Sequence, residues 1–364
     1  MARVEREQSH LLRILGLLGA QGRRLGASGG NLMRILLFAL FLATVPLWLN
    51  TPYALSTLVL IGIYTIVITG LCLLMGYAGQ ISLGQAAFFG LGAYGSAILT
   101  VHWHWSPWVA LVAAALITGG IAYVVGIPIL RLRGHYLALG TLAFGVIVHI
   151  VLTEWRAYTG GPTGLPGIPR LAIGGTPLKG DLVYFYLVWT VVLVGLAVAL
   201  RIVNSRFGRA LKAIRASEPA AESLGIPIAS YKLQALVTSA IYASVAGSLY
   251  AHYMIFVSPS AFDFGVSVRL VLMAAVGGLA SIWGAPFGAA AVVLLALALR
   301  EILRLLIKHG SGEQQLVAYG VLLVVIMIFV PEGLTAAGMR AWRRVGGLRG
   351  LLQRQRAKRQ VRGR

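Results

Sequence analysis

The chain has 364 residues, of which 58% are hydrophobic and only 11% are charged, and its mean hydropathy is +0.83. This composition excludes an ordinary soluble domain and predicts an all-α, polytopic membrane protein. The formal net charge of +21 could suggest a nucleic-acid partner, but 24 of the 31 lysines and arginines fall in segments that one topology places on the same side of a membrane. The charge therefore indicates topology, and we expect no nucleic-acid partner.

Ten apolar runs along the chain are candidates for transmembrane helices. A bilayer core of roughly 30 Å needs about 20 apolar residues in a helix, and most of the runs have that length. The third and eighth runs are rich in glycine and fit the pattern least well. The runs cover residues 33–49, 53–75, 83–101, 107–130, 135–153, 183–200, 233–257, 266–282, 286–306 and 315–331.

The positions of the basic residues predict the orientation of these helices. Short loops rich in lysine and arginine stay in the cytoplasm, so both termini and the stretch 201–232 are expected there, in a multi-pass membrane protein. The outer side then receives the segments 102–107, 154–182, 258–264 and 308–314. An interfacial belt of tryptophans supports this assignment at Trp48, Trp103, Trp105, Trp108 and Trp155.

The segment Gly76–Thr100 reads GYAGQISLGQAAFFGLGAYGSAILT and is crowded with glycine and alanine. Small residues let helix backbones approach closely in lipid. A polar side chain at this depth needs a hydrogen-bond partner or faces a water-filled path. The candidates for lining a translocation path are Gln80, Ser82, Gly84 and Gln85.

Within this segment, residues 90–95 match the G-x-G-x-x-G pattern of dinucleotide-binding proteins. That site needs an acidic residue about 20 positions further on, and no Asp or Glu occurs between Glu7 and Glu154. We therefore interpret the glycines as helix-packing residues. The single cysteine, Cys72, lies in an apolar run and gives neither a disulfide nor a metal cluster, so no cofactor and no metal are expected.

The external stretch 154–182 contains TGGPTGLPGIPR at residues 159–170, where glycine and proline predict rigid turns. It is either a connector or a surface for an external protein. A second glycine-rich junction, residues 277–288, loosely resembles residues 79–90 and suggests an internal repeat.

The basic stretch 201–232 contains two predicted helices. Residues 207–216 have apolar and basic side chains at helical spacing. Ser217 can cap a second helix with Pro219 in its first turn, and Gly225 can end that helix in the left-handed conformation. Such a helix at the membrane surface is either a docking element for a soluble partner or a solvated connector.

Several kinds of chemistry are missing from the sequence. There is no G-x-x-x-x-G-K-[ST] phosphate loop and no catalytic constellation, so the chain is not expected to be an enzyme. No acid lies near the centre of a predicted span, as an ion-coupled carrier would need, and His135 and His149 are better explained as interfacial or packed histidines. These absences favour a pore that moves its solute without ion coupling and is driven by a separate protein that supplies the energy.

Four stretches of the chain resemble the permease family of bacterial branched-chain amino acid ABC importers. They occur in order within roughly residues 35–335, and the TGG-x-x-GL-x-GIPR loop is most similar to the family's M-type subunit. The stretches are GYAGQISLGQAAFFGLGAY (76–94), TGGPTGLPGIPR (159–170), GRALKAIRASEPAAESLGI (208–226) and GGLASIWGAPFGA (277–289).

The resemblance implies a location in the bacterial inner membrane, a function and partners. It implies an ABC importer permease that pairs with a second homologous permease, two cytoplasmic ATPase subunits and a periplasmic solute-binding protein. Branched-chain amino acids are the implied solutes. Urea or short amides are the alternative solutes, and an ion-coupled secondary carrier is the alternative mechanism.

The resemblance also implies a docking site. Residues 218–225 resemble the E-A-A-x-x-x-G loop by which ABC importers dock on their ATPases, with Pro219 as a departure from it. The implied docking residues are Glu218, Pro219, Ala220, Ala221, Glu222 and Gly225. The expected organisation is a basic cytoplasmic extension (1–31), a transmembrane permease domain (32–335) with a docking loop at 201–232 and a periplasmic loop at 154–182, and a basic cytoplasmic tail (336–364).

Overall fold

The computed structural model describes residues 33–306, apart from residues 50, 133, 174–175 and 179. The predicted extension 1–31, the tenth run 315–331 and the tail 336–364 lie outside the described residues. The chain divides into two units, Met1–Thr51 and Pro52–Arg364. In the first unit, Met33–Trp48 is an apolar helix, as predicted for the first run.

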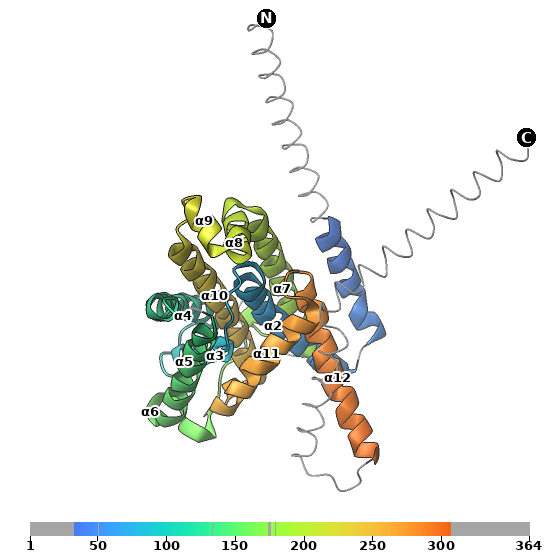
Figure 1. Cartoon of the computed structure of the whole chain (residues 1–364). Helices are drawn as coiled ribbons and strands as arrows, with labels where there is room; N and C mark the ends of the chain where they lie inside the picture. The colour runs from blue at the N-terminus through green and yellow to red at the C-terminus, as the bar shows by residue number, and fades with distance from the viewer. Residues whose placement is uncertain (1–32, 50, 133, 174–175, 179, 307–364) are drawn as a thin grey trace, which may run out of the picture. The chain divides into compact units, whose positions relative to one another are not determined.

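The second unit is built from long apolar helices (Figure 1). Six helical segments in the described chain are long and apolar enough to cross a bilayer, and three shorter apolar helices account for the first, third and ninth predicted runs. The all-α, polytopic prediction is therefore confirmed. The long helices are α2 (Pro52–Leu71) with the π-helix η1 (Cys72–Tyr77), α3 (Gln85–Val101), α4 (Pro107–Ile129), α5 (His135–Glu154), α7 (Asp181–Asn204), α10 (Ile228–Met254), α11 (Phe264–Gly277) and α12 (Gly284–Leu306).

Two helix boundaries differ from the prediction by five residues. Helix α10 begins at Ile228 rather than at residue 233, so Lys232 lies within its first turns. Helix α11 ends at Gly277 rather than at residue 282. The chain leaves the helix at Gly278, whose φ of +98° is a conformation that glycine adopts readily, and a new helix begins at Gly284. Residues 278–283 are thus a break between two helices, like residues 78–84 between η1 and α3.

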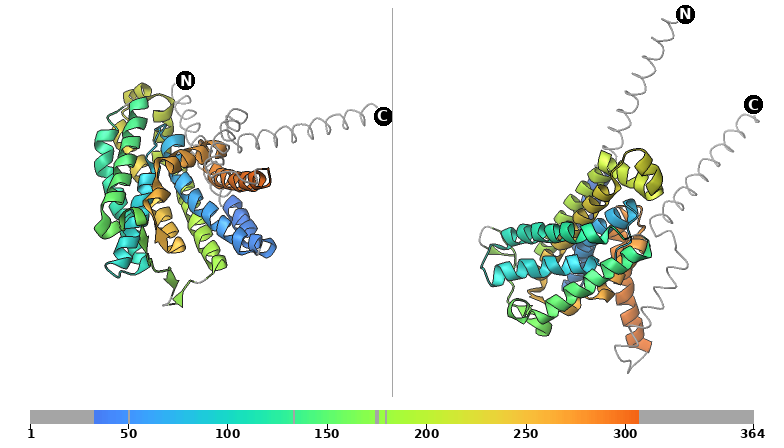
Figure 2. Two further views of the ribbon diagram at one scale, coloured as in Figure 1. Left: turned by 90° about the horizontal axis from the view of Figure 1, so that it is seen from below. Right: turned by 60° about the vertical axis from the view of Figure 1, so that its left-hand side comes forward.

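Helix α10 is the centre of the second unit and packs most extensively on α3 and α4. The contact with α3 is close because a Cβ atom on Gly92 would overlap Ser244, and a Cβ atom on Gly247 would overlap the Phe89 carbonyl. Both views in Figure 2 show α4 and α5 on one side of this unit and α12 on the other. Small residues therefore set the helix spacing, as predicted from the segment Gly76–Thr100.

The glycines of the G-x-G-x-x-G pattern are packing residues, which confirms the interpretation made from the sequence. All three lie inside α3, and each faces a different neighbour: Gly90 faces Phe262, Gly92 faces Ser244 and Gly95 faces Ala114. The pattern occupies the middle of a helix rather than a strand-to-helix turn, so it cannot cradle a phosphate.

The loop 154–182, predicted to be external, is more ordered than a plain connector. Its strand β1 pairs antiparallel with β4, and β2 pairs with β3. The ring of His252 on α10 contacts both Ser96 Oγ and the Pro169 carbonyl, each at 2.7 Å, which ties this loop to α3 and α10. Its elements are α6 (Arg156–Thr159), η2 (Gly161–Thr163), β1 (Leu165–Pro166), β2 (Ala172–Ile173) and β3 (Thr176–Pro177), and β4 (Phe256–Val257) follows α10.

The prediction of an external loop at residues 258–264 is wrong in its second half. After β4, the short helix η3 (Pro259–Phe262) carries the chain back among the helices. The Phe262 ring packs on Phe89 of α3 with ring centroids 5.2 Å apart, and on Tyr250 of α10 at 6.0 Å. Aromatic packing inside the bundle therefore draws this segment inward, and α11 starts beside the interior of α3.

Candidate functional site

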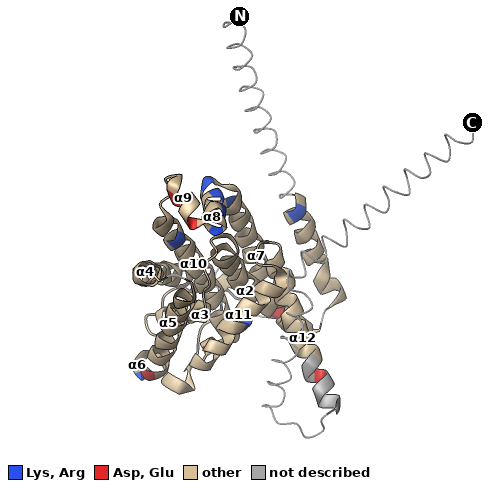
Figure 3. Cartoon of the chain, in the orientation of Figure 1, with Lys and Arg blue, Asp and Glu red and all other residues tan. Residues whose placement is uncertain are grey.

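Two short helices, α8 (Arg206–Ala216) and α9 (Glu218–Ser223), join α7 to α10. Helix α8 starts where Ser205 Oγ accepts a hydrogen bond from Gly208 N at 3.3 Å. It buries Leu211 and Ile214, while its basic side chains are exposed. Figure 3 shows Lys and Arg gathered on α8 and the acidic residues on α9. The two predicted helices are confirmed, and they leave a charged surface at one end of the helices.

Helix α9 has a defined start and a defined end. Ser217 Oγ accepts a hydrogen bond from Ala220 N at 3.4 Å, and Pro219 lies in the first turn. At the other end, Gly225 N donates to Glu222 O at 2.9 Å and Ile226 N donates to Ala221 O at 3.1 Å, with Gly225 at φ +75°. This pair of bonds is a Schellman motif, and it satisfies carbonyls that would otherwise lack partners.

The six implied docking residues do not all face outward. Ala221 is buried and packs inward. The Glu218 carboxylate accepts a hydrogen bond from the Lys232 ammonium at 2.7 Å, which joins α9 to α10. Pro219, Ala220, Glu222 and Gly225 are exposed, and so is Leu224, whose side chain is 77% accessible.

Sequence reasoning missed two of these features. Leu224 was not singled out, although an apolar residue between Ser223 and Gly225 in a polar loop was the available signal. Lys232 was counted only as a topology charge, because nothing in the local pattern shows that it reaches Glu218 fourteen residues away.

Helix α8 is attached to the end of η1, just before the break at residues 78–84. The Arg215 guanidinium donates a hydrogen bond to the Gly76 carbonyl in η1. The Lys212 ammonium lies 5.5 Å from the centre of the Tyr77 ring. A Cβ atom on Gly76 would overlap the Leu279 carbonyl, so the break at 278–283 meets the same end of η1. Any displacement of α8 therefore acts directly on η1, and through it on the second helix break.

The four path candidates lie where the chain passes from η1 into α3. Gln85 is fully buried, and its amide donates to the Ser239 carbonyl at 3.2 Å and to Ser239 Oγ at 3.1 Å, so it joins α3 to α10. Gln80 is buried and bonds locally to the Ala78 carbonyl at 3.2 Å. Ser82 Oγ is buried without a hydrogen-bond partner in the described part of the structure.

Gly84, the fourth candidate, lies against α5. A Cβ atom at this position would overlap the Thr141 carbonyl, and the Thr141 hydroxyl accepts a hydrogen bond from Leu83 N at 2.9 Å. At the start of α3, Gln85 thus contacts α10, while the preceding Gly84 contacts α5. Lining of the path by these residues stays a prediction.

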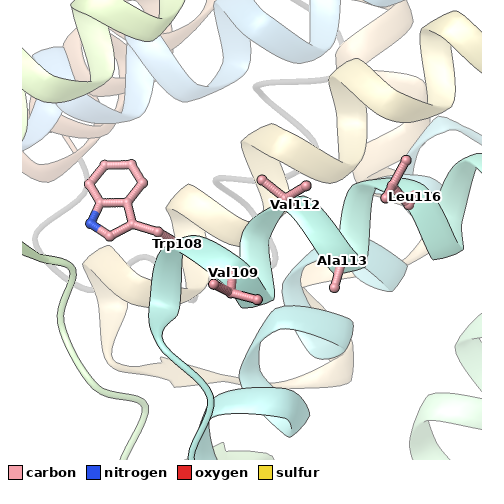
Figure 4. Close-up of a pocket in the computed structure, with 5 residues that line it drawn as sticks. All are labelled: Trp108, Val109, Val112, Ala113 and Leu116. Carbon is pink, nitrogen blue, oxygen red and sulfur yellow. The ribbon is translucent and has the colours of Figure 1, made fainter.

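A shallow, open surface groove of about 480 Å³ lies along α4 (Figure 4). Figure 4 shows its side chains along the first turns of α4, and they are Trp108, Val109, Val112, Ala113 and Leu116. This lining offers no charged group and no hydroxyl that could fix a zwitterion. We therefore assign it to contact with hydrocarbon rather than to solute binding.

The chain is similar in sequence to known permeases for branched-chain amino acids. The family model described as branched-chain amino acid transport system, permease component, matches residues 53–331. The high-affinity branched-chain amino acid transport system permease protein LivM of Escherichia coli K12 is 34% identical over 295 residues, covering 75% of this chain and 67% of that protein. A probable LivM of Methanocaldococcus jannaschii is 25% identical over 316 residues, covering 75% of this chain and 90% of that protein.

A more distant relative differs in its solute. The nucleoside ABC transporter permease protein NupC of Lactococcus lactis is 24% identical over 196 residues, covering 48% of this chain and 59% of that protein. No solved structure gives a significant match to the chain.

Proposed function

Because this chain belongs to the branched-chain amino acid permease family of ABC transporters, we propose that it translocates leucine, isoleucine and valine as one subunit of an ATP-driven importer. The chain is the non-catalytic permease component of such a system. In the proposed complex it pairs with a second homologous permease in the lipid bilayer. Two cytoplasmic ATPase subunits and a periplasmic binding protein complete the assembly.

The observation that carries this proposal is the geometry of α8 and α9. Helix α9 is capped at both ends, is exposed along Pro219, Ala220 and Glu222, and ends in an exposed Leu224. A rigid helix of this kind can enter a groove on a soluble partner with little loss of conformational freedom. The partner that supplies ATP-driven movement would bind here.

The proposed transport cycle follows from these attachments. The binding protein delivers the solute to the outer side, and closure of the ATPase dimer displaces α9 and α8. Arg215 carries that displacement to η1 through its bond to Gly76. The helices that meet at the two breaks then alternate between outward-open and inward-open arrangements.

The proposal places both termini and α8–α9 in the cytoplasm, within a bacterial inner membrane. It assigns residues 32–335 to the permease domain, with 1–31 and 336–364 as basic cytoplasmic extensions. The proposal assigns Gln80, Ser82, Gly84 and Gln85 to the lining of the solute path.

Uptake into proteoliposomes tests the function. The complete complex, with binding protein outside and ATP inside, should accumulate radiolabelled leucine, and unlabelled isoleucine and valine should compete. An ATPase subunit that cannot hydrolyse ATP is the matched control and should abolish uptake. Competition by urea, acetamide or a nucleoside instead of the aliphatic amino acids would assign another solute. Uptake that needs an ion gradient rather than ATP would contradict the importer mechanism.

A further inference from the structure

One carboxylate lies deeper among the helices than the sequence predicted. Asp263 directly precedes α11, and its Oδ1 accepts a hydrogen bond from Val266 N at 2.9 Å. One turn further on, Ser267 Oγ accepts a hydrogen bond from Ala86 N of α3 at 3.0 Å. Ala86 is fifteen residues before Val101, so this level of α3 lies roughly 20 Å from the Val101 end of the helix.

Helix α5 gives the same depth independently. Asp263 shares a narrow crevice with Leu142, Gly145 and Val146. These three residues are at the midpoint of α5, which runs from His135 to Glu154. Since α5 is about as long as a bilayer core is thick, roughly 30 Å, Asp263 lies within the depth that α5 spans. The sequence places no acid near the centre of a span, whereas the chain re-enters the bundle before α11 begins and brings Asp263 beside the middle of α5.

The rest of the crevice is apolar or small. Apart from Asp263 and Ser267, it is lined by aliphatic, aromatic and small residues: Leu83, Ala86, Ala87, Leu142, Gly145, Val146, Phe262 and Phe264. Its volume of about 10 Å³ is too small for an amino acid, so α5 must separate from α3 and α11 before a solute can enter. Helix α5 buries only Leu137, Thr141, Val148 and Leu152, which makes it one of the least embedded spans in the described chain.

The negative charge of Asp263 needs a cation or water molecules beside it at this depth. Its side chain is exposed in the isolated chain, and the ion pair found among the described residues joins Lys232 to Glu218 instead. A carboxylate within the bilayer core faces a water-filled path or a cation rather than lipid, because burying it unpaired in hydrocarbon is costly.

We propose that Asp263 binds the α-ammonium group of the amino acid as it passes between α3, α5 and α11, while the apolar crevice residues contact its aliphatic side chain. The inference rests on the proposed function. Carboxylate and ammonium form a charge-assisted hydrogen bond, and the low local dielectric strengthens it. Urea and short amides lack a cationic group, so Asp263 selects amino acids against them.

Three variants at Asp263 separate its charge from its capping role. Asn and Ser are good N-caps, so Asp263→Asn and Asp263→Ser keep the start of α11 but remove the charge. Asp263→Glu keeps the charge and weakens the cap. In the complete complex in proteoliposomes, we expect leucine uptake to fall at least tenfold in the Asn and Ser variants. Hydrolysis stimulated by the leucine-loaded binding protein should stay within twofold of wild type, and the Glu variant should transport better than both.

Two results would overturn the inference. Wild-type uptake by the Asn and Ser variants, with a defective Glu variant, would leave Asp263 only a helix cap. Loss of the partner permease during purification of the Asn and Ser variants would show that Asp263 pairs with a cation of that subunit. Wild-type leucine uptake, measured alongside, tests the proposed function separately because it depends on no change at Asp263.

Discussion

Gly225 determines how α9 ends. Its φ of +75° lies in the left-handed region, and a Cβ atom there would meet nothing within 4 Å. A substitution is therefore opposed by backbone strain alone, which amounts to roughly 1–2 kcal/mol for most residues and more for β-branched ones.

We expect Gly225→Val to weaken association with the ATPase subunits about tenfold or more, because the Schellman bonds of the helix end would be lost. Insertion and pairing with the second permease depend on the apolar helices and should survive. The measurement is co-purification of the ATPase subunits, together with hydrolysis stimulated by the binding protein. Gly225→Asn is the matched control, since asparagine tolerates the left-handed conformation. Full stimulation with Gly225→Val would show that the loop is a solvated connector.

The ion pair between Glu218 and Lys232 makes a second residue-scale prediction. From the sequence, Glu218→Lys would act only through the dipole of α9. In the structure it places a second ammonium group beside the buried Lys232, so we expect α9 to separate from α10 and the complex to lose about 1–3 kcal/mol of stability.

The thermal unfolding midpoint of the purified complex measures this effect. Glu218→Gln alone should also be destabilising, because Lys232 would lose its charged partner. The double variant Glu218→Gln with Lys232→Met should recover part of the loss, since it removes the unpaired charge. Additive effects of the two substitutions would mean that the pair contributes nothing to holding α9.

At the scale of elements, the two helix breaks would connect docking to transport in the proposed cycle. One break follows η1 and the other follows α11, and they meet where Gly76 lies against Leu279. Helix α8 contacts this junction through Arg215. The loose sequence resemblance between residues 79–90 and 277–288 thus corresponds to a shared design, in which a helix ends at a break and a new helix starts at or next to a glycine.

The contact between α3 and α5 yields an element-scale prediction. We expect Gly84→Leu to abolish leucine uptake while the protein still inserts, because its side chain would force α5 away from the turn before α3. Uptake and membrane content are measured together. Gly120→Leu on α4 is the matched control, because a Cβ atom at Gly120 meets nothing within 4 Å. Normal uptake by the Gly84→Leu variant would remove this turn from the solute path.

At the scale of the whole molecule, the bias of basic residues predicts that α8–α9 and the external loop lie on opposite sides of the membrane. In a Cys72→Ala background, single cysteines at Ser217 and Thr163 are both placed at exposed positions. An impermeant thiol reagent on intact cells should label Thr163→Cys at least tenfold more than Ser217→Cys. Cys72 itself is fully buried and gives a low background. Strong labelling of Ser217→Cys would invert the topology.

The sequence by itself determined the membrane class, the number and order of the apolar helices in the described chain, and the ends of α8 and α9. Each of these depends on local chemistry: the length of an apolar run, a serine that can cap a helix, or a glycine that can end one. The four sequence blocks also indicated the family correctly.

The tertiary structure alone decided which residues meet. It brought Lys232 to Glu218, turned Ala221 inward, placed Gln85 on Ser239 and carried Asp263 to the level of the middle of α5. The physical reason is that a membrane helix is apolar on the faces toward lipid and toward its neighbours alike. Its sequence therefore lacks the amphipathic period that shows the inner face of a soluble helix, and only the packing of distant segments selects that face.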